Sequence, residues 1–157
     1  MAGLLDPQYG IGDIQGLLAP YIGLQPGAPL GRRYGADERM PYDSERKYFK
    51  ANPHVAGMAA EDNRVVMNPY GLLGPREQDA VRMNEAARIW MRNNGGPRFA
   101  LTPEQTRYLG GTTYAGANEN DRRATIAARL LSGDPSAGAP TPEQQQYVEM
   151  LRRALGQ

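Results

Sequence analysis

The chain has 157 residues, a formal net charge of +1, 19 Gly, 13 Pro, two Phe, one Trp and no Cys. The lack of cysteine excludes disulfides, thiolate metal ligands and a cysteine nucleophile, and the balanced charge gives no electrostatic footprint for direct nucleic-acid binding. Because alanine supplies much of the hydrophobic content, we expect one small domain with a small core and loop-rich segments.

Residues 1–36 form a segment rich in Gly and Pro, and only Asp6 and Asp13 are charged among residues 1–31. A solvated disordered tail would be charged and poor in large apolar residues, whereas this segment contains many of them. We therefore predict an extended N-terminal arm that docks on another subunit; the alternative is that it wraps the helices of its own chain. No apolar run in the chain reaches the length of a membrane span. The predicted partner-binding residues are Leu4, Leu5, Tyr9, Ile11, Ile14, Leu17, Leu18, Tyr21, Ile22, Arg32 and Arg33.

Residues 37–157 are predicted to form a small α-rich domain, which opens with a short helix or turn over residues 42–50. A β-hairpin is predicted near residues 54–68, because residues 61–63 (Glu-Asp-Asn) are a good turn sequence and two valines follow them. An isolated two-stranded hairpin is marginally stable in water, so it must pack on helices or join the sheet of a neighbour.

The clearest helix is predicted over residues 75–94, with Pro75 at the first helical position and Gly95 as the C-terminal cap. Its apolar stripe at helical spacing consists of Met83, Ala86, Ala87, Trp90 and Met91. We predict that Trp90 anchors the core of the domain; the alternative is that the stripe binds a partner.

The tetrapeptide Thr-Pro-Glu-Gln occurs twice, at residues 102–105 and 141–144. In each copy Thr is suited to cap a helix, Pro to take its first position and Gln to reach back to the cap. The residues after the two copies differ, so we interpret them as two caps that share a mechanism, not as a repeat. Further helices are predicted over residues 121–131 and 142–155. The whole pattern predicts a mainly α fold: a small helical domain with one short β-hairpin and a long N-terminal arm.

Few residues in the chain suggest catalysis. His54 is the only histidine, and no second ligand or Asp-His-Ser spacing accompanies it. Glu61 and Asp62 are adjacent, so on a strand they would point to opposite faces, which is poor geometry for a two-carboxylate hydrolase. Phosphate-cradling loops, dinucleotide motifs, metalloprotease motifs and nucleophile elbows are all absent from the sequence. We therefore predict a protein that is not an enzyme, with no catalytic residue, no cofactor and no metal site.

Several runs of the sequence resemble one group of viral proteins. These runs are YFKANPHVAGMAAEDNRVVMNPY (48–70), NEAARIWMR (84–92), LTPEQ (101–105), TIAARLLSGDPSAG (125–138) and PTPEQ (140–144). They look like small uncharacterised virion-associated structural proteins of tailed bacteriophages, chiefly short-tailed, podovirus-like ones. The resemblance covers roughly residue 42 to the C-terminus and leaves the arm outside it.

The resemblance implies a non-enzymatic structural or adaptor subunit of the tail, the neck or the internal protein set. Its partners would be other virion proteins in a symmetric oligomeric assembly, and its location would be the virion, assembled in the host cytoplasm. Two other functions stay open at this point. One is a small soluble phage or bacterial binding or regulatory module, and the other is a cell-wall hydrolase without a recognisable motif.

Overall fold

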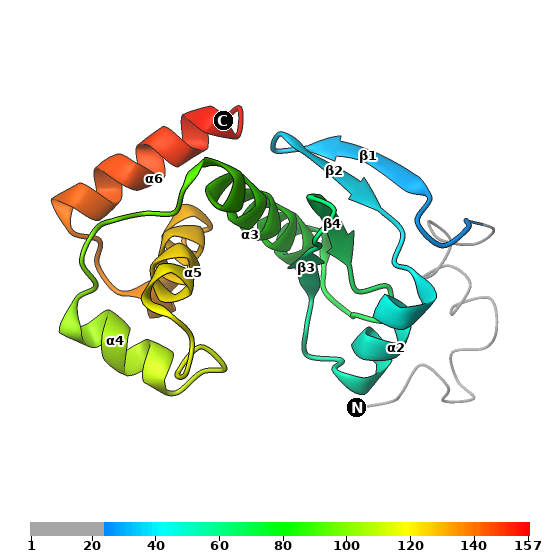
Figure 1. Cartoon of the computed structure of the whole chain (residues 1–157), viewed down its shortest axis with the longest axis horizontal. Coiled ribbons are helices and arrows are strands. Elements are labelled where there is room, and N and C mark those ends of the chain that lie inside the picture. The colour runs from blue at the N-terminus through cyan, green and yellow to red at the C-terminus, as the bar shows by residue number, and fades with distance from the viewer. Residues whose placement is uncertain (1–23) are drawn as a thin grey trace.

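The computed structural model describes residues 24–157, which form a mixed α/β fold of five α-helices and one four-stranded sheet (Figure 1). The predicted arm residues from Leu4 to Ile22 lie outside the described residues. The elements follow in the order β1 (Pro29–Arg33), β2 (Ala36–Arg39), α2 (Asp43–Ala51), β3 (Gly57–Ala59), β4 (Arg64–Met67), α3 (Pro75–Asn94), α4 (Pro103–Gly110), α5 (Glu119–Leu131), the 3₁₀ helix η2 (Pro135–Ala137) and α6 (Pro142–Ala154).

The sheet consists of two hairpins placed side by side, in the strand order β1-β2-β4-β3. Strands β3 and β4 are antiparallel with Gly57 opposite Met67, which confirms the hairpin predicted near residues 54–68. Strands β1 and β2 form a second antiparallel hairpin, and β2 runs parallel to β4. The prediction of a mainly α fold with one hairpin is therefore wrong, because residues 29–39 add two strands to the chain's own sheet.

The turn between β1 and β2 explains why the sequence pattern did not reveal it. Tyr34 and Gly35 are its two central residues, and their φ angles are 53° and 74°, as a two-residue type I′ hairpin turn requires. Asn or Asp is the usual first residue of such a turn, since a larger side chain is strained at positive φ. Here the Tyr34 hydroxyl donates a hydrogen bond to the carboxylate of Asp79 on α3, and its ring packs against the core. These contacts hold Tyr34 in the strained conformation.

The two faces of the sheet are covered by different helices. Val65 and Met67 of β4 belong to the main core with α3, whereas Val66 between them packs with Phe49 of α2. The main core also includes α5 and α6, and Figure 1 shows α3 running between the sheet and these C-terminal helices. Helix α3 is therefore the element that joins the two halves of the molecule.

Helix α3 spans residues 75–94 as predicted, and Gly95 is its C-terminal cap with φ 77°. Three of its four buried residues, Ala86, Ala87 and Met91, belong to the predicted stripe, and the fourth is Ile89, because α3 is covered on more than one side. Trp90 is only partly buried and packs at the margin of the core. The centre of the interface instead holds Ala86 and Ala87, whose small side chains let the neighbouring elements approach the helix closely.

The two Thr-Pro-Glu-Gln copies meet in the structure. Thr102 and Thr141 are N-caps of α4 and α6, and each accepts a hydrogen bond from the backbone N–H of the glutamine three residues later. The side-chain amides of Gln105 and Gln144 donate to each other's carbonyl oxygens, each over 2.9 Å. Both side chains are fully buried.

Every hydrogen-bonding position of this amide pair is used. Gln105 donates its second N–H to the Ala137 carbonyl oxygen, and Gln144 donates its second N–H to the Ala100 carbonyl oxygen. The two side-chain oxygens also accept from the cap N–H groups of Thr102 and Thr141. A buried polar pair satisfied in this way stabilises one arrangement of the two helix starts, because any slippage leaves buried polar groups unpaired.

The pair can be tested with Gln144→Glu. Glutamate at this position still accepts from the Thr141 N–H and so preserves the cap, but it loses both N–H donors and adds a buried charge. We expect a loss of about 3 kcal/mol in the free energy of unfolding, measured by urea denaturation at pH 7. The matched control Gln145→Glu alters an exposed neighbour on the same helix and should change stability by less than about 0.5 kcal/mol. Equal losses in the two variants would contradict the role of the amide pair.

Candidate interaction groove

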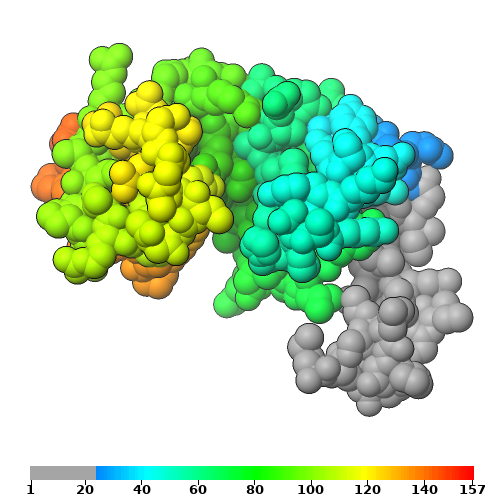
Figure 2. Space-filling view, turned by 60° about the horizontal axis from the view of Figure 1, so that its bottom comes forward, coloured from blue at the N-terminus to red at the C-terminus, as the bar shows by residue number. Residues whose placement is uncertain are grey.

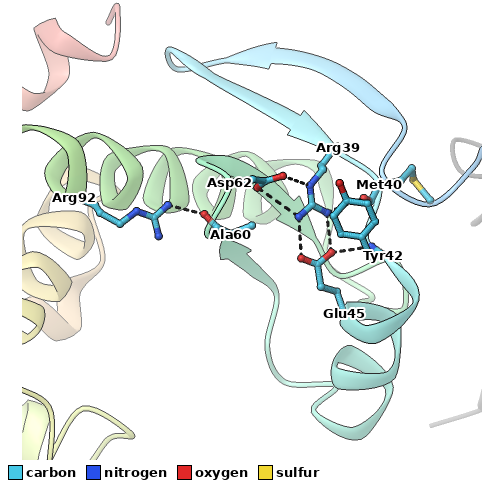
Figure 3. Close-up of polar contacts among 7 residues, drawn as sticks. All are labelled: Arg39, Met40, Tyr42, Glu45, Ala60, Asp62 and Arg92. Atoms are coloured by element: carbon cyan, nitrogen blue, oxygen red, sulfur yellow. Dashed lines mark hydrogen bonds and ion pairs between the residues drawn. The ribbon is translucent and has the colours of Figure 1, made fainter.

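The guanidinium of Arg39, at the end of β2, joins three segments of the N-terminal half (Figure 3). Its Nη1 and Nη2 donate to the two carboxylate oxygens of Glu45 over 2.7 and 2.9 Å, and Nε donates to Asp62 over 2.8 Å. Nη1 also donates to the Met40 carbonyl oxygen, and the guanidinium lies 4.1 Å from the ring centroid of Tyr42. With a side chain only 2% exposed, Arg39 ties β2 to α2 and to the β3–β4 turn.

The charges around Arg39 stabilise each other. The hydrogen bond from Arg39 lowers the pKa of Glu45, and the N–H of Tyr42, 2.8 Å away, contributes to the same shift. Burial of Asp62 opposes its ionised form, but the contacts with Arg39 and, after them, Arg64 outweigh this effect and leave the pKa of Asp62 below its ordinary value. Asp62 lies in the turn predicted for residues 61–63, and its carboxylate holds that turn against Arg39.

Next to this cluster, a groove of about 920 Å³ separates the N-terminal half from the C-terminal helices. Figure 2 shows the hollow between α2 and the start of α5. One wall carries Tyr48 and Met58, and the opposite wall carries Tyr114 and Ala124. The floor is a face of α3. The groove therefore combines aromatic and apolar walls with a floor that carries charge.

Two arginines of the floor hold the walls in place. Arg88 donates from Nη2 to the Thr125 hydroxyl of α5 over 3.1 Å, and its guanidinium lies 5.2 Å from the ring centroid of Tyr114. Arg92, one helical turn further on, donates from Nη2 to the Ala60 carbonyl oxygen over 2.6 Å (Figure 3). Consecutive turns of α3 thus fix the C-terminal wall and the hairpin wall.

The surroundings of Glu85, on the floor of the groove, disfavour its ionised form. Burial raises its pKa, while Arg88, the backbone N–H of Ala59 and Arg129 favour the ionised form without compensating fully. The closest charged atom is Nε of Arg88, 3.9 Å from a carboxylate oxygen of Glu85. Carboxylates whose pKa is raised cluster at functional sites, although structural ion-pair networks also produce such shifts.

The structure places the predicted site residues in different regions. Arg32 and Arg33 lie on β1, where they form exposed ion pairs with Asp37 and Asp79, respectively. The other predicted partner-binding residues, all before residue 24, lie outside the described residues. His54 is exposed on the rim of the groove.

No pattern in the sequence predicted that the floor and the far wall of this groove come together. Glu85 and Arg88 have the spacing of a helical ion pair, which is a signal for a neighbouring pair but not for a groove. Tyr114 lies in a loop that has no periodic pattern. Among the helices of residues 24–157, none combines the length and the apolar character that crossing a membrane requires.

Arg39→Met tests the ion cluster. The substitution leaves the carboxylates of Glu45 and Asp62 unpaired, and we expect a loss of about 3 kcal/mol in unfolding free energy at pH 7. Because the lowered pKa of these groups stabilises the fold only above their ordinary pKa, the deficit should shrink as the pH falls below about 4. The control Arg32→Met removes an exposed pair and should cost less than about 1 kcal/mol. A deficit that does not depend on pH would contradict the electrostatic origin.

Glu85→Gln tests the strain in the floor. A carboxyl whose pKa is raised by folding supports stability below its ordinary pKa, and this support is lost as the pH rises through the raised value. The variant should therefore unfold at higher urea concentration than the wild type at pH 8, and the difference should vanish near pH 4, about the ordinary pKa. Glu149→Gln, on the exposed side of α6, should show no such difference. A variant less stable than the wild type at pH 8 would show that the pairing with Arg88 outweighs burial.

The groove is thus a preformed trough whose arginines hold its walls and whose aromatic and apolar side chains are available for contact with another chain. Its combination of aromatic, apolar and charged side chains is typical of surfaces that contact another protein. No family model, curated protein or solved structure matches this chain, so the inference of function depends on the residues and the geometry described above.

Proposed function

We propose that this protein is a non-enzymatic structural or adaptor subunit of a bacteriophage particle, in the tail, the neck or the internal protein set. The observation that carries the proposal is the open groove of about 920 Å³ between two halves that share α3. Its charged side chains bond mainly within the protein, with Arg88 on Thr125 and Arg92 on Ala60. That arrangement suits a surface that receives another chain better than one that carries out a reaction.

The way the N-terminal segment joins the domain supports the proposal. Gln25 to Ala28 form a turn in which the Ala28 N–H donates to the Gln25 carbonyl oxygen over 3.0 Å. Gly27 has φ 76°, and a Cβ at this position would lie 2.4 Å from a ring atom of Tyr42, so the turn requires glycine. Met40 bonds the second half of the turn: its N–H donates to the Ala28 carbonyl oxygen, and its carbonyl oxygen accepts from the Gly27 N–H.

Residues before this turn are therefore attached next to the Arg39 cluster, at a fixed point on the surface. An apolar segment on such a base can tie one subunit to the next, and a subunit of a particle needs contacts of this kind. The sequence resemblance to virion proteins of tailed phages points to the same class of assembly.

The groove would also serve a small soluble binding or regulatory module of a phage or bacterium. Mass spectrometry separates the two functions. In particles purified from a phage that encodes this chain, we expect its peptides at a fixed ratio to the other virion proteins. Its presence only in the soluble fraction of the infected cell would support the regulatory module and contradict the proposal.

Deleting residues 1–23 provides the second test. The deletion leaves β1 and the turn at residues 25–28 in place, so we expect the domain to keep its helical circular dichroism. Incorporation into particles should be lost. As a control, Glu149→Gln on the exposed side of α6 should leave incorporation close to wild type. Normal incorporation of the truncated protein would show that the segment does not hold the subunit.

A further inference from the structure

Glu85, on the floor of the groove, is a carboxylate whose acceptor positions are only partly used. It accepts a hydrogen bond from the backbone N–H of Ala59, and the nearest cationic atom, Nε of Arg88, lies 3.9 Å away, beyond hydrogen-bond distance. That Nε instead donates to the side-chain oxygen of Asn84 over 3.1 Å. A carboxylate can accept about four hydrogen bonds, so Glu85 keeps unused acceptor positions in the lining of the groove.

A second carboxylate, Asp121, lines the opposite wall in the first turn of α5. One of its oxygens accepts from the side-chain amide of Asn118 over 2.8 Å, and no hydrogen bond from residues 24–157 reaches the other oxygen. Asp121 precedes Thr125 by about one helical turn, and Thr125 receives the hydrogen bond from Arg88. This contact between α3 and α5 places Glu85 and Asp121 in the same part of the groove.

The other charged side chains of the lining are already engaged. Arg88 and Arg92 donate to a hydroxyl, to side-chain amide oxygens and to backbone carbonyl oxygens of the chain itself. The third acid, Glu45, is paired with Arg39. An incoming cation would therefore find unused acceptors, whereas an incoming acid would meet three acids and two arginines whose N–H groups are bonded elsewhere.

The geometry of the groove favours recognition of a side chain over addition of a strand. Ala59, on the edge strand β3, donates its N–H to Glu85, and its carbonyl oxygen accepts from Arg92 over 3.3 Å. A strand added at this edge would have to displace both contacts. Tyr48 on the wall is 46% exposed, and its ring is available for a cation–π contact. Unused carboxylate oxygens beside an exposed aromatic ring suit the side chain of lysine or arginine.

We propose that the groove binds a basic segment of a partner protein, whose lysine or arginine side chain bonds Glu85 and Asp121. This inference rests on the proposed function, since it names the chemistry of the chain that the subunit receives. Residues 1–23 contain no lysine and no arginine. The occupant is therefore not the N-terminal segment of this chain, whether from the same copy or from another.

A library of random peptides displayed on yeast gives the first test. The bait is the full-length chain, and peptides that also bind a folded Ala124→Trp variant are discarded, because its larger side chain is placed to fill the groove. We expect the remaining peptides to be enriched in lysine and arginine at least about twofold over the starting library, since charge-assisted hydrogen bonds are the stronger ones. The control bait Ala154→Trp, exposed on α6 and outside the groove, should bind the same peptides as the wild type.

Two results of the selection would overturn the proposal. Peptides rich in leucine, isoleucine and acids, which is the composition of residues 1–23, would assign the groove to an N-terminal segment of this chain. A failure to find any peptide that distinguishes the wild type from Ala124→Trp would show that the groove does not bind a segment of polypeptide.

Glu85→Gln tests the pairing without blocking the groove, since it keeps the shape of the side chain and removes its charge. With the tightest selected peptide, fluorescence anisotropy at pH 8 should show an affinity about tenfold lower than that of the wild type. Asp121→Asn, at an exposed position, should lower the affinity about threefold. The control Glu149→Gln lies outside the groove and should bind like the wild type. Equal affinities of Glu85→Gln and Glu149→Gln would overturn the proposal.

A double-mutant cycle identifies the basic side chain that pairs with Glu85. Each lysine or arginine of the peptide is replaced in turn by glutamine. One replacement should cost about tenfold against the wild type and less than about twofold against Glu85→Gln. Equal costs against both proteins for every replacement would contradict the pairing. These measurements use the isolated chain, so they can fail while mass spectrometry of particles still supports the proposed function. Equally, the groove can bind a basic segment in a protein that is never found in particles.

Discussion

A guanidinium removed from water must be fully paired, and in this protein that requirement fixes the arrangement of the N-terminal half. Arg39 is 2% exposed, and its bonds reach Glu45 on α2 and Asp62 in the β3–β4 turn. A buried cation without partners costs several kcal/mol, so the three segments cannot separate without exposing or orphaning a charge. Glu45 also accepts a hydrogen bond from the backbone N–H of Tyr42, the N-cap of α2. The base of the N-terminal segment and one wall of the groove therefore depend on a single side chain.

The C-terminal half is held in a comparable way without net charge. Gln105 and Gln144 are fully buried, and each uses all four hydrogen-bonding positions of its amide. The Arg39 cluster and the Gln105–Gln144 pair suit a chain with only two Phe and one Trp, because large apolar side chains are too few to specify the packing by shape alone. The hydrophobic core provides the driving force for folding, and the polar contacts select one arrangement of the elements.

The sequence predicted the elements that are set by interactions between residues close together in the chain. The bounds of α3, the caps Thr102 and Thr141 and the β3–β4 hairpin follow from residues a few positions apart, and the structure confirms them. The β1–β2 hairpin was missed because its turn carries Tyr34 at positive φ, and a distant residue, Asp79, stabilises that conformation. The parallel pairing of β2 with β4, the contact between the two caps and the groove all bring together residues far apart in the chain. No periodicity or spacing signals such contacts.

The floor of the groove shows why the site is formed before anything binds to it. Arg88 and Arg92 are four residues apart on α3, so about one helical turn separates the side chain that holds α5 from the side chain that holds the hairpin. A segment entering the groove would therefore meet walls whose positions are already fixed, and the entropy lost on binding would fall mainly on the segment itself. Glu85 would add a second effect, because a chain covering the groove without a cation would remove its carboxylate further from water, raise its pKa further and so bind more weakly as the pH rises.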